Sequence, residues 1–305
     1  MYPTRRGQAA LATLFGIAAV VTYAAVAMGS LVCATDSSAA CPNWPGCYVG
    51  QVLPAGRLNP LIEFVHRVVA VSTGPVLLAA ALAALPRRRE PAVRWLPWVA
   101  LAGAVVAGVF GMLTIRVGLT TTQAAADLGF SLIAMIAMIT AAQAVRRTPR
   151  RWELGRAGAY AWGAVAVFFA VHVSGVFAAG PGSLTRCVGC PAWTIVAIDG
   201  PVPLQIARIV AALGALVLTG AALLTARHDG TSPVLLAVTG GLVVLELAAG
   251  LLMVTLGTSS VLGSVHSVTM VTLLAAITLV AARSTIRTSD DASDAQPTPS
   301  SVTTG

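Results

Sequence analysis

LATLFGIAAVVTYAAVAMGSLV, residues 11–32, is an apolar run without a single charged side chain. An α-helix rises 1.5 Å per residue, so about 20 apolar residues cross the ~30 Å hydrocarbon core of a bilayer. Arg5 and Arg6 precede this run and no small-residue cleavage signature follows it, which favours a retained first span over a signal peptide. Seven more apolar runs of similar length begin near Pro60, Val93, Thr122, Ala157, Pro203, Ser232 and Val261.

The composition of the chain supports the same class of protein. Of the 305 residues, 57% are hydrophobic and only 10% are charged, and the mean hydropathy is +0.84. These values exclude an ordinary soluble globular domain. The sequence therefore predicts an all-α membrane protein with eight transmembrane helices.

The net charge of +8 comes entirely from arginines, which cluster between the apolar runs. This distribution indicates membrane topology and predicts no nucleic-acid partner. Because the clusters follow the second, fourth, sixth and eighth runs, we expect both termini in the cytoplasm of a multi-pass protein of the cell (plasma) membrane. The polar tail, residues 288–305, is expected to be disordered. The clusters are Arg87 to Arg89 with Arg94, Arg146 to Arg156, Arg227, and Arg283 with Arg287.

The two halves of the chain look duplicated. Gly111-Met-Leu-Thr-Ile-Arg-Val-Gly118 matches Gly250-Leu-Leu-Met-Val-Thr-Leu-Gly257 without a gap, and the same offset places Asp127 opposite His266. We therefore predict two pseudo-repeated four-helix bundles, as in other membrane proteins built by duplication. Their expected bounds are 1–145 and 157–287, joined by an Arg-rich cytoplasmic linker at 146–156.

Ionisable side chains inside spans are costly in lipid, so each needs a partner or a cavity. Four positions, His66, Asp127, Ala207 and His266, lie five or six residues from the outward ends of their helices, hence at one depth of ~8 to 9 Å. The ionisable side chains inside the predicted spans are Glu63, His66, Arg67, Asp127, His172, Arg208, Glu246 and His266.

Glu63, His66 and Arg67 form the sharpest motif, because spacings of three and four residues place them on one helix face. They can act together on a ligand, or Glu63 and Arg67 can simply form an internal ion pair. His266 is either a core histidine or a ligand, and its place in the repeat favours a ligand. For His172 we favour packing or a bond within its helix, and for Glu246 a polar bond between helices.

All five cysteines lie in loops predicted to face outward, where the environment is oxidising. We expect the pairs Cys41 with Cys47 and Cys187 with Cys190 to be disulfides, which leaves Cys33 over. A zinc site is disfavoured because neither loop contains a histidine. A redox role for the short Cys187 to Cys190 pair stays open.

The loop Cys41-Pro-Asn-Trp-Pro-Gly-Cys47, the face Glu63-Phe-Val-His66-Arg67 and the eight duplicated spans together resemble the heme A synthase family. The resemblance implies oxidation of a ring methyl of heme O to a formyl group, giving heme A for cytochrome oxidase assembly. It implies Glu63 as the catalytic residue and His66 and His266 as ligands of heme iron, with Arg67, Arg208 and Asp127 also in the cofactor-binding set.

The same resemblance implies the wider surroundings of the reaction. Heme O and catalysis belong to the N-terminal half, and heme B, the electron-transfer cofactor, to the C-terminal half. The implied partners are a farnesyltransferase that produces heme O, an unidentified electron donor and membrane lipid. A homo-oligomer is left open.

The chain departs from the family's four-histidine pattern at two positions. Asp127 and Ala207 stand where the second ligand of each half is expected, so each half keeps one imidazole of two. Heme held by a single histidine is chemically ordinary and leaves an axial position open. The alternatives are a non-catalytic heme-binding or assembly protein of the same fold and, less favoured, a permease subunit.

Overall fold

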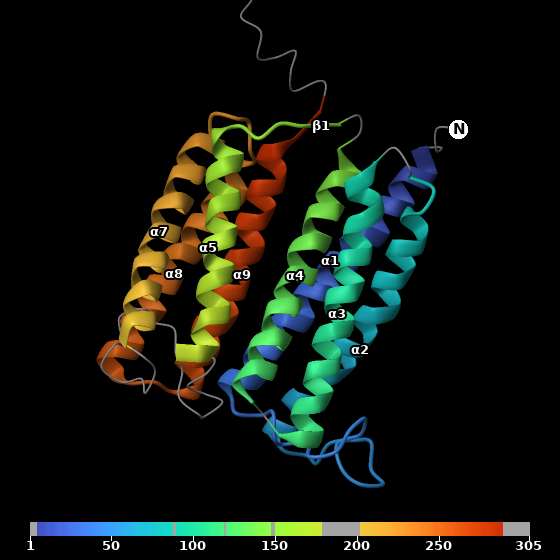
Figure 1. Cartoon of the computed structure of the whole chain (residues 1–305), viewed down its shortest axis with the longest axis vertical. Helices are drawn as coiled ribbons and strands as arrows, with labels where there is room; N and C mark the ends of the chain where they lie inside the picture. Colours follow the sequence, from blue (N-terminus) through green and yellow to red (C-terminus); the bar gives the residue numbers. More distant parts are fainter. Residues whose placement is uncertain (1–4, 88–89, 119, 148–149, 179–201, 289–305) are drawn as a thin grey trace, which may run out of the picture.

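A computed structural model describes residues 5–87, 90–118, 120–147, 150–178 and 202–288, and eight long helices dominate these ranges (Figure 1). Each helix is long and apolar enough to cross a membrane, which confirms the predicted all-α, eight-span fold. The first begins at Arg5, earlier than the apolar run alone indicates. The helices are α1 (Arg5–Ala34), α2 (Leu58–Ala84), α3 (Pro91–Val117), α4 (Thr121–Arg146), α5 (Arg156–Ala178), α7 (Val202–Ala226), α8 (Pro233–Leu256) and α9 (Ser260–Thr285).

The helices form two groups of four that lie side by side in Figure 1. In the first group α1, α2, α3 and α4 pack as a closed ring, and in the second α5, α7, α8 and α9 do the same. Helices α4 and α9, the fourth of each group, are the most deeply buried and contact each other at the centre. The Tyr23 and Thr272 hydroxyls, 2.7 Å apart, bond α1 to α9 across this boundary.

The turn into the fourth helix has the same construction in both groups. Gly118 and Gly257 end α3 and α8 with φ of 92° and 85°, a left-handed conformation that glycine adopts without strain. Thr120 and Ser259 then cap α4 and α9 by accepting a bond from a backbone N–H three residues on. The sequence duplication is therefore also a duplication of local structure.

A small β-ladder at the end of the helices was not predicted. Strand β1 (Arg150–Trp152) pairs antiparallel with β2 (Ile286–Thr288), with Trp152 opposite Ile286. Arg147 strengthens this closure by donating to the Arg283 and Ile286 carbonyls at 3.1 and 2.6 Å. The segment expected to be only a linker is therefore tied to the end of α9.

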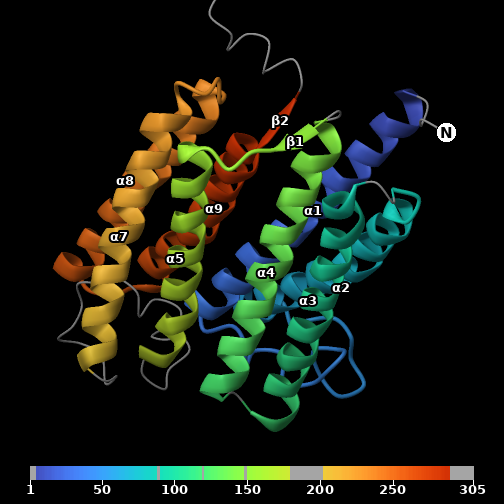
Figure 2. The same ribbon diagram turned by 45° about the horizontal axis from the view of Figure 1, so that its top comes forward.

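The two strands lie at the same end of the molecule as the start of α1 (Figure 2). This placement agrees with termini on one side of the membrane. Their assignment to the cytoplasm stays a prediction from the arginine distribution. The tail expected to be disordered lies outside the described residues from position 289 onward.

Close packing of α3 on α4 depends on Gly103. A Cβ at this position would lie 2.8 Å from the Phe130 carbonyl oxygen, a backbone atom that cannot move aside. We expect Gly103→Ala to lower the free energy of unfolding by about 1 to 3 kcal/mol through overpacking. Thermal unfolding in detergent measures this, with Gly241→Ala as the control, because a Cβ at Gly241 meets no atom within 4 Å. Equal midpoints for both variants would contradict the prediction.

Candidate functional site

The first turns of α2 carry the acid, imidazole and guanidinium on one face, as their spacing predicts. Glu63 is 5% exposed although it is a carboxylate. Arg67 Nε donates to Glu63 Oε1 at 2.7 Å, one helical turn away. The internal ion pair that the sequence left open is therefore present, and it compensates the burial of both charges.

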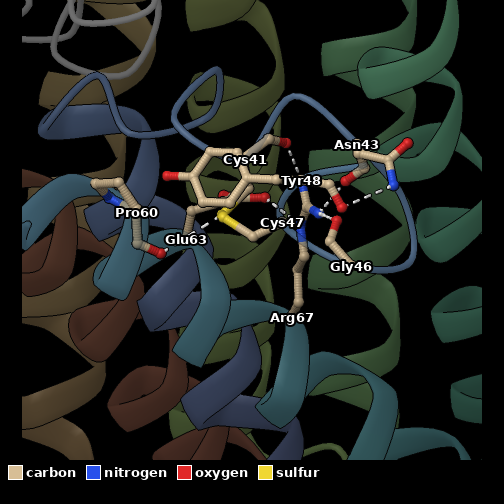
Figure 3. The surroundings of a disulfide bond; sticks show 8 residues. All are labelled: Cys41, Asn43, Gly46, Cys47, Tyr48, Pro60, Glu63 and Arg67. Carbon is tan, nitrogen blue, oxygen red and sulfur yellow. Dashed lines mark hydrogen bonds and ion pairs between the residues drawn. A yellow bond between two sulfur atoms is a disulfide. The ribbon is translucent and has the colours of Figure 1, made fainter. Parts of the chain in front are cut away.

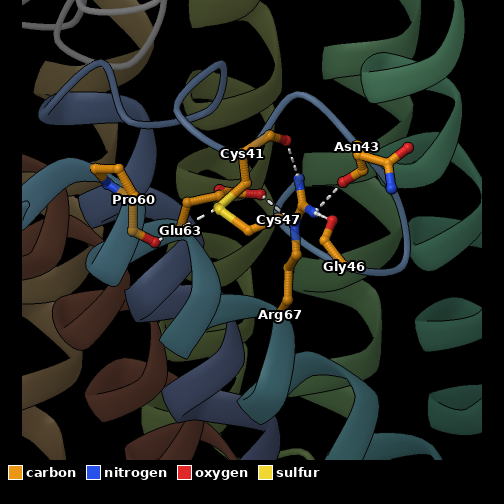
Figure 4. Close-up of polar contacts among 7 residues, drawn as sticks. All are labelled: Cys41, Asn43, Gly46, Cys47, Pro60, Glu63 and Arg67. Carbon is orange, nitrogen blue, oxygen red and sulfur yellow. Dashed lines mark hydrogen bonds and ion pairs between the residues drawn. A yellow bond between two sulfur atoms is a disulfide. The ribbon is translucent and has the colours of Figure 1, made fainter. Parts of the chain in front are cut away.

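The same arginine also holds the disulfide loop. Its Nη1 donates to the carbonyls of Asn43 and Gly46 at 2.6 and 3.0 Å, and its Nη2 to that of Cys41 at 2.7 Å (Figure 4). The predicted disulfide between Cys41 and Cys47 is present, and both cysteines are fully buried. Figure 3 shows the loop folded over the ends of the Glu63 and Arg67 side chains. The loop therefore covers the carboxylate from the outer end of the bundle.

His66 is left without a comparable partner on its Nδ1 atom, which is buried and makes no hydrogen bond. Its ring lies against α1 at Gly29, where an added Cβ would stand 3.2 Å from His66 Cε1. The absence of a side chain at position 29 thus gives the imidazole its place. A buried ring nitrogen without a partner is available for a ligand.

A cavity of about 420 Å³ occupies the interior of the N-terminal group. One end is polar, with Glu63, His66, Arg67 and Asp127, and Trp44 of the disulfide loop also lines it. The rest of the wall consists mainly of valine, alanine and glycine from α2 and α3. This mixture of an apolar wall and a few convergent polar groups is typical of small-molecule sites, as is the volume.

A second cavity, of about 230 Å³, lies between the two groups of helices. It is lined by three imidazoles, His66 from α2, His172 from α5 and His266 from α9, together with Glu63 and Asp127. The structure thus brings the predicted layer of ionisable residues together around two adjoining spaces. Asp127 lines both cavities and is hydrogen-bonded to Ser131 one turn further along α4.

In the C-terminal group His266 is 3% exposed and pairs with a carboxylate. Its Nδ1 lies 2.6 Å from Glu246 Oε1 on α8, an ion-pair distance without hydrogen-bond geometry, and its Nε2 also makes no hydrogen bond. Glu246 thus makes a polar contact between α8 and α9, in agreement with the prediction of a polar contact between helices. A carboxylate behind an imidazole orients the ring and raises its basicity as a metal ligand.

Two other predicted residues of this half also make specific contacts. Arg208 donates to the Ser174 hydroxyl at 3.2 Å and to the Val171 carbonyl at 3.4 Å, both on α5. His172 Nδ1 lies 2.7 Å from the Phe168 carbonyl one turn back, so it donates there, as the prediction of a bond within the helix requires. Its Nε2 is then an acceptor, and it is buried without a partner.

Sequence reasoning missed the contact between Glu246 and His266. The repeat places Ala107 opposite Glu246, so the duplication gave no signal for this acid. The expectation that Cys33 would be left over is wrong, because Cys33 is disulfide-bonded. The predicted pair of Cys187 with Cys190 lies outside the described residues. Within the described ranges, no three His, Cys, Asp or Glu side chains are grouped closely enough to hold a bare metal ion.

The branched guanidinium group of Arg67 joins the disulfide loop to α2, so Arg67→Lys should release this loop. A lysine can pair with Glu63 but cannot reach three carbonyls from separate nitrogens. Each lost bond to a charged group is worth about 2 kcal/mol. We expect faster amide hydrogen exchange at residues 41–47, measured by mass spectrometry. Arg57→Lys, at an exposed position in the same region, is the control, and unchanged exchange in Arg67→Lys would refute the role assigned to the guanidinium.

Comparison with known proteins gives two matches. The family described as COX15-CtaA, cytochrome oxidase assembly protein, matches residues 57–278 of this chain. A heme A synthase of Shewanella oneidensis is 27% identical over 160 residues, an alignment that covers 46% of this chain and 47% of that protein. The alignment thus spans about half the length of this curated relative.

Proposed function

The chain belongs to the COX15-CtaA family of cytochrome oxidase assembly proteins, and from this premise we propose that it converts heme O into heme A. In this reaction a ring methyl of heme O is oxidised to a formyl group with water as the oxygen source, which releases four protons and passes four electrons to an acceptor outside the chain. The observation that carries the proposal is the buried Glu63 beside the unpartnered His66 nitrogen at the polar end of an apolar cavity.

The residues around this cavity fit a porphyrin substrate. The volume of about 420 Å³ falls in the range of ~300 to 1,000 Å³ usual for small-molecule sites. His66 Nδ1 is buried and free to bind iron, and Arg67 and Asp127 supply polar contacts at the same end. The apolar wall suits the face of a porphyrin ring.

Glu63 is assigned the proton-transfer role. Its carboxylate accepts a hydrogen bond from Arg67 at 2.7 Å, and Glu63 lines the larger cavity. In that position it orients a water molecule or accepts a proton at the methyl carbon being oxidised. The loop fastened by Arg67 limits the entry of bulk water from the outer end, which favours directed proton transfer over side reactions.

The C-terminal half is assigned the bound cofactor, heme B. His266 would hold the iron of heme B, since Glu246 lies 2.6 Å from its Nδ1 and its Nε2 makes no hydrogen bond. When bound, heme B supplies electron transfer between the substrate site and an electron partner outside the chain. Heme O would come from a farnesyltransferase in the same membrane.

A second candidate function is supported by the altered ligand set. Asp127 and Ala207 stand where the family resemblance implies histidines, so each half offers one imidazole at the expected position. A protein of this kind would hold or pass heme in oxidase assembly without oxidising it. The same cavities and the same two histidines serve this function, and only the requirement for Glu63 separates the two.

Loss of the Glu63 carboxylate tests the reaction directly. In a bacterial host that makes heme O but lacks its own heme A synthase, the wild-type chain should produce heme A. Glu63→Gln should lower that yield by about 100-fold or more, the usual contribution of a positioned acid or base, and heme O should accumulate. Chromatography of extracted hemes measures both. Glu153→Gln, at an exposed acid, is the control. Heme A at the wild-type level in Glu63→Gln would favour the assembly role.

The C-terminal site is tested by heme content. We expect His266→Ala to lose bound heme B on purification, measured by pyridine hemochrome spectra. Glu246→Gln should weaken heme binding by about tenfold or more, because it removes the carboxylate that orients the imidazole. His228→Ala, at an exposed histidine after α7, should leave the heme content unchanged. Full retention of heme B in His266→Ala would refute the assignment of this ligand.

A further inference from the structure

The cavity of the N-terminal group has a side opening toward the membrane. Three valines of α2 and α3 that line it are also strongly exposed: Val71 at 68%, Val105 at 56% and Val109 at 46%. In a membrane-spanning bundle such surfaces face lipid. The polar chamber around Glu63 therefore continues into the hydrocarbon layer through the gap between these two helices.

Glycines keep this gap open. Gly74 on α2 and Gly108 on α3 both line the cavity, and a Cβ added at either would meet no atom within 4 Å. These glycines are therefore not required by helix packing, unlike Gly103, which lies five residues before Gly108 on α3. The space beside them is available to another molecule.

The duplicated half carries larger side chains at the corresponding positions. The offset that aligns Gly111 with Gly250 places Gly108 opposite Leu247 and Ala104 opposite Val243. Leu247 is 36% exposed on α8, so a bulky side chain is tolerated at that position of the fold. The small residues at these aligned positions are thus a feature of the half that contains Glu63.

The shape and polarity of the cavity indicate what passes through it. Along α2 the lining runs from Glu63 to Gly74, eleven residues apart, which is ~16 Å of helix. The polar end carries the acid and the unpartnered nitrogen of His66, and the other end is apolar and reaches lipid. These features suit a ligand with a polar head that an imidazole can bind and a long hydrocarbon chain.

We propose that the gap between α2 and α3 is the entrance by which heme O reaches Glu63 from the membrane, and that its isoprenoid chain stays in this gap when the ring is bound. The inference rests on the proposed function, since it takes heme O as the substrate. It assigns Gly74 and Gly108 to substrate recognition, a role separate from the chemistry at Glu63.

The test compares a heme with the chain and one without it. The purified protein in lipid nanodiscs is titrated with heme O and with heme B, and equilibrium affinity and association rate are recorded from the absorbance change. We expect the wild type to bind heme O more tightly than heme B at this site. Gly108→Leu introduces the residue found at the aligned position of the other half. It should lower the affinity for heme O by about tenfold, because a few methylene groups of the isoprenoid chain lose their contacts, and it should change the affinity for heme B little. It should slow the association of both hemes.

Two further variants complete the design. Gly108→Ala adds one methyl group to open space and should give a smaller loss with the same selectivity, which guards against misfolding of the leucine variant. Gly241→Leu in α8 is the matched control, because this exposed glycine also has no atom within 4 Å and lies outside both cavities. It should leave both hemes unaffected.

The outcomes separate the two proposals. The wild type could bind heme O while Gly108→Leu and Gly108→Ala still prefer heme O over heme B as strongly as the wild type does. In that case the proposed entrance is wrong and the gap holds only lipid, but the proposed function stands. If the wild type fails to bind heme O at all, the proposed function fails and the entrance fails with it.

Discussion

The N-terminal site depends on the compensation of one buried carboxylate. Glu63 lies within a membrane span, where an unpaired charge would cost several kcal/mol. Arg67 supplies the countercharge at 2.7 Å and uses its remaining nitrogens on three carbonyls of the disulfide loop. The acid, the cover above it and the start of α2 are therefore one hydrogen-bonded unit. On the same face, His66 Nδ1 is buried and makes no hydrogen bond, so it is available to a ligand.

The two halves place their carboxylates differently. Arg208 occupies the position equivalent to Arg67 and donates to Ser174 and Val171 of α5. The carboxylate of this half comes from α8, where Glu246 pairs with His266. One half thus places its acid beside an open cavity and the other places it behind an imidazole. This difference supports a reactive site in the first half and a cofactor site in the second.

Much of this arrangement could be predicted from the sequence, because burial in lipid leaves few choices. Apolar runs fixed the number of helices, and the spacing of Glu63, His66 and Arg67 fixed their common face. The contacts that depend on how distant helices pack were not accessible in this way. The pairing of Glu246 with His266 joins two helices, and the smaller cavity brings together imidazoles from α2, α5 and α9. No local pattern encodes such contacts.

The short ladder of β1 with β2 has a consequence for biosynthesis. Its first strand lies at the midpoint of the chain and its second only at residues 286–288, so the ribosome must synthesise the entire C-terminal half before the two can pair. The strand of the linker has no strand partner until then. Pairing of the two strands at this end is consequently a late event of translation.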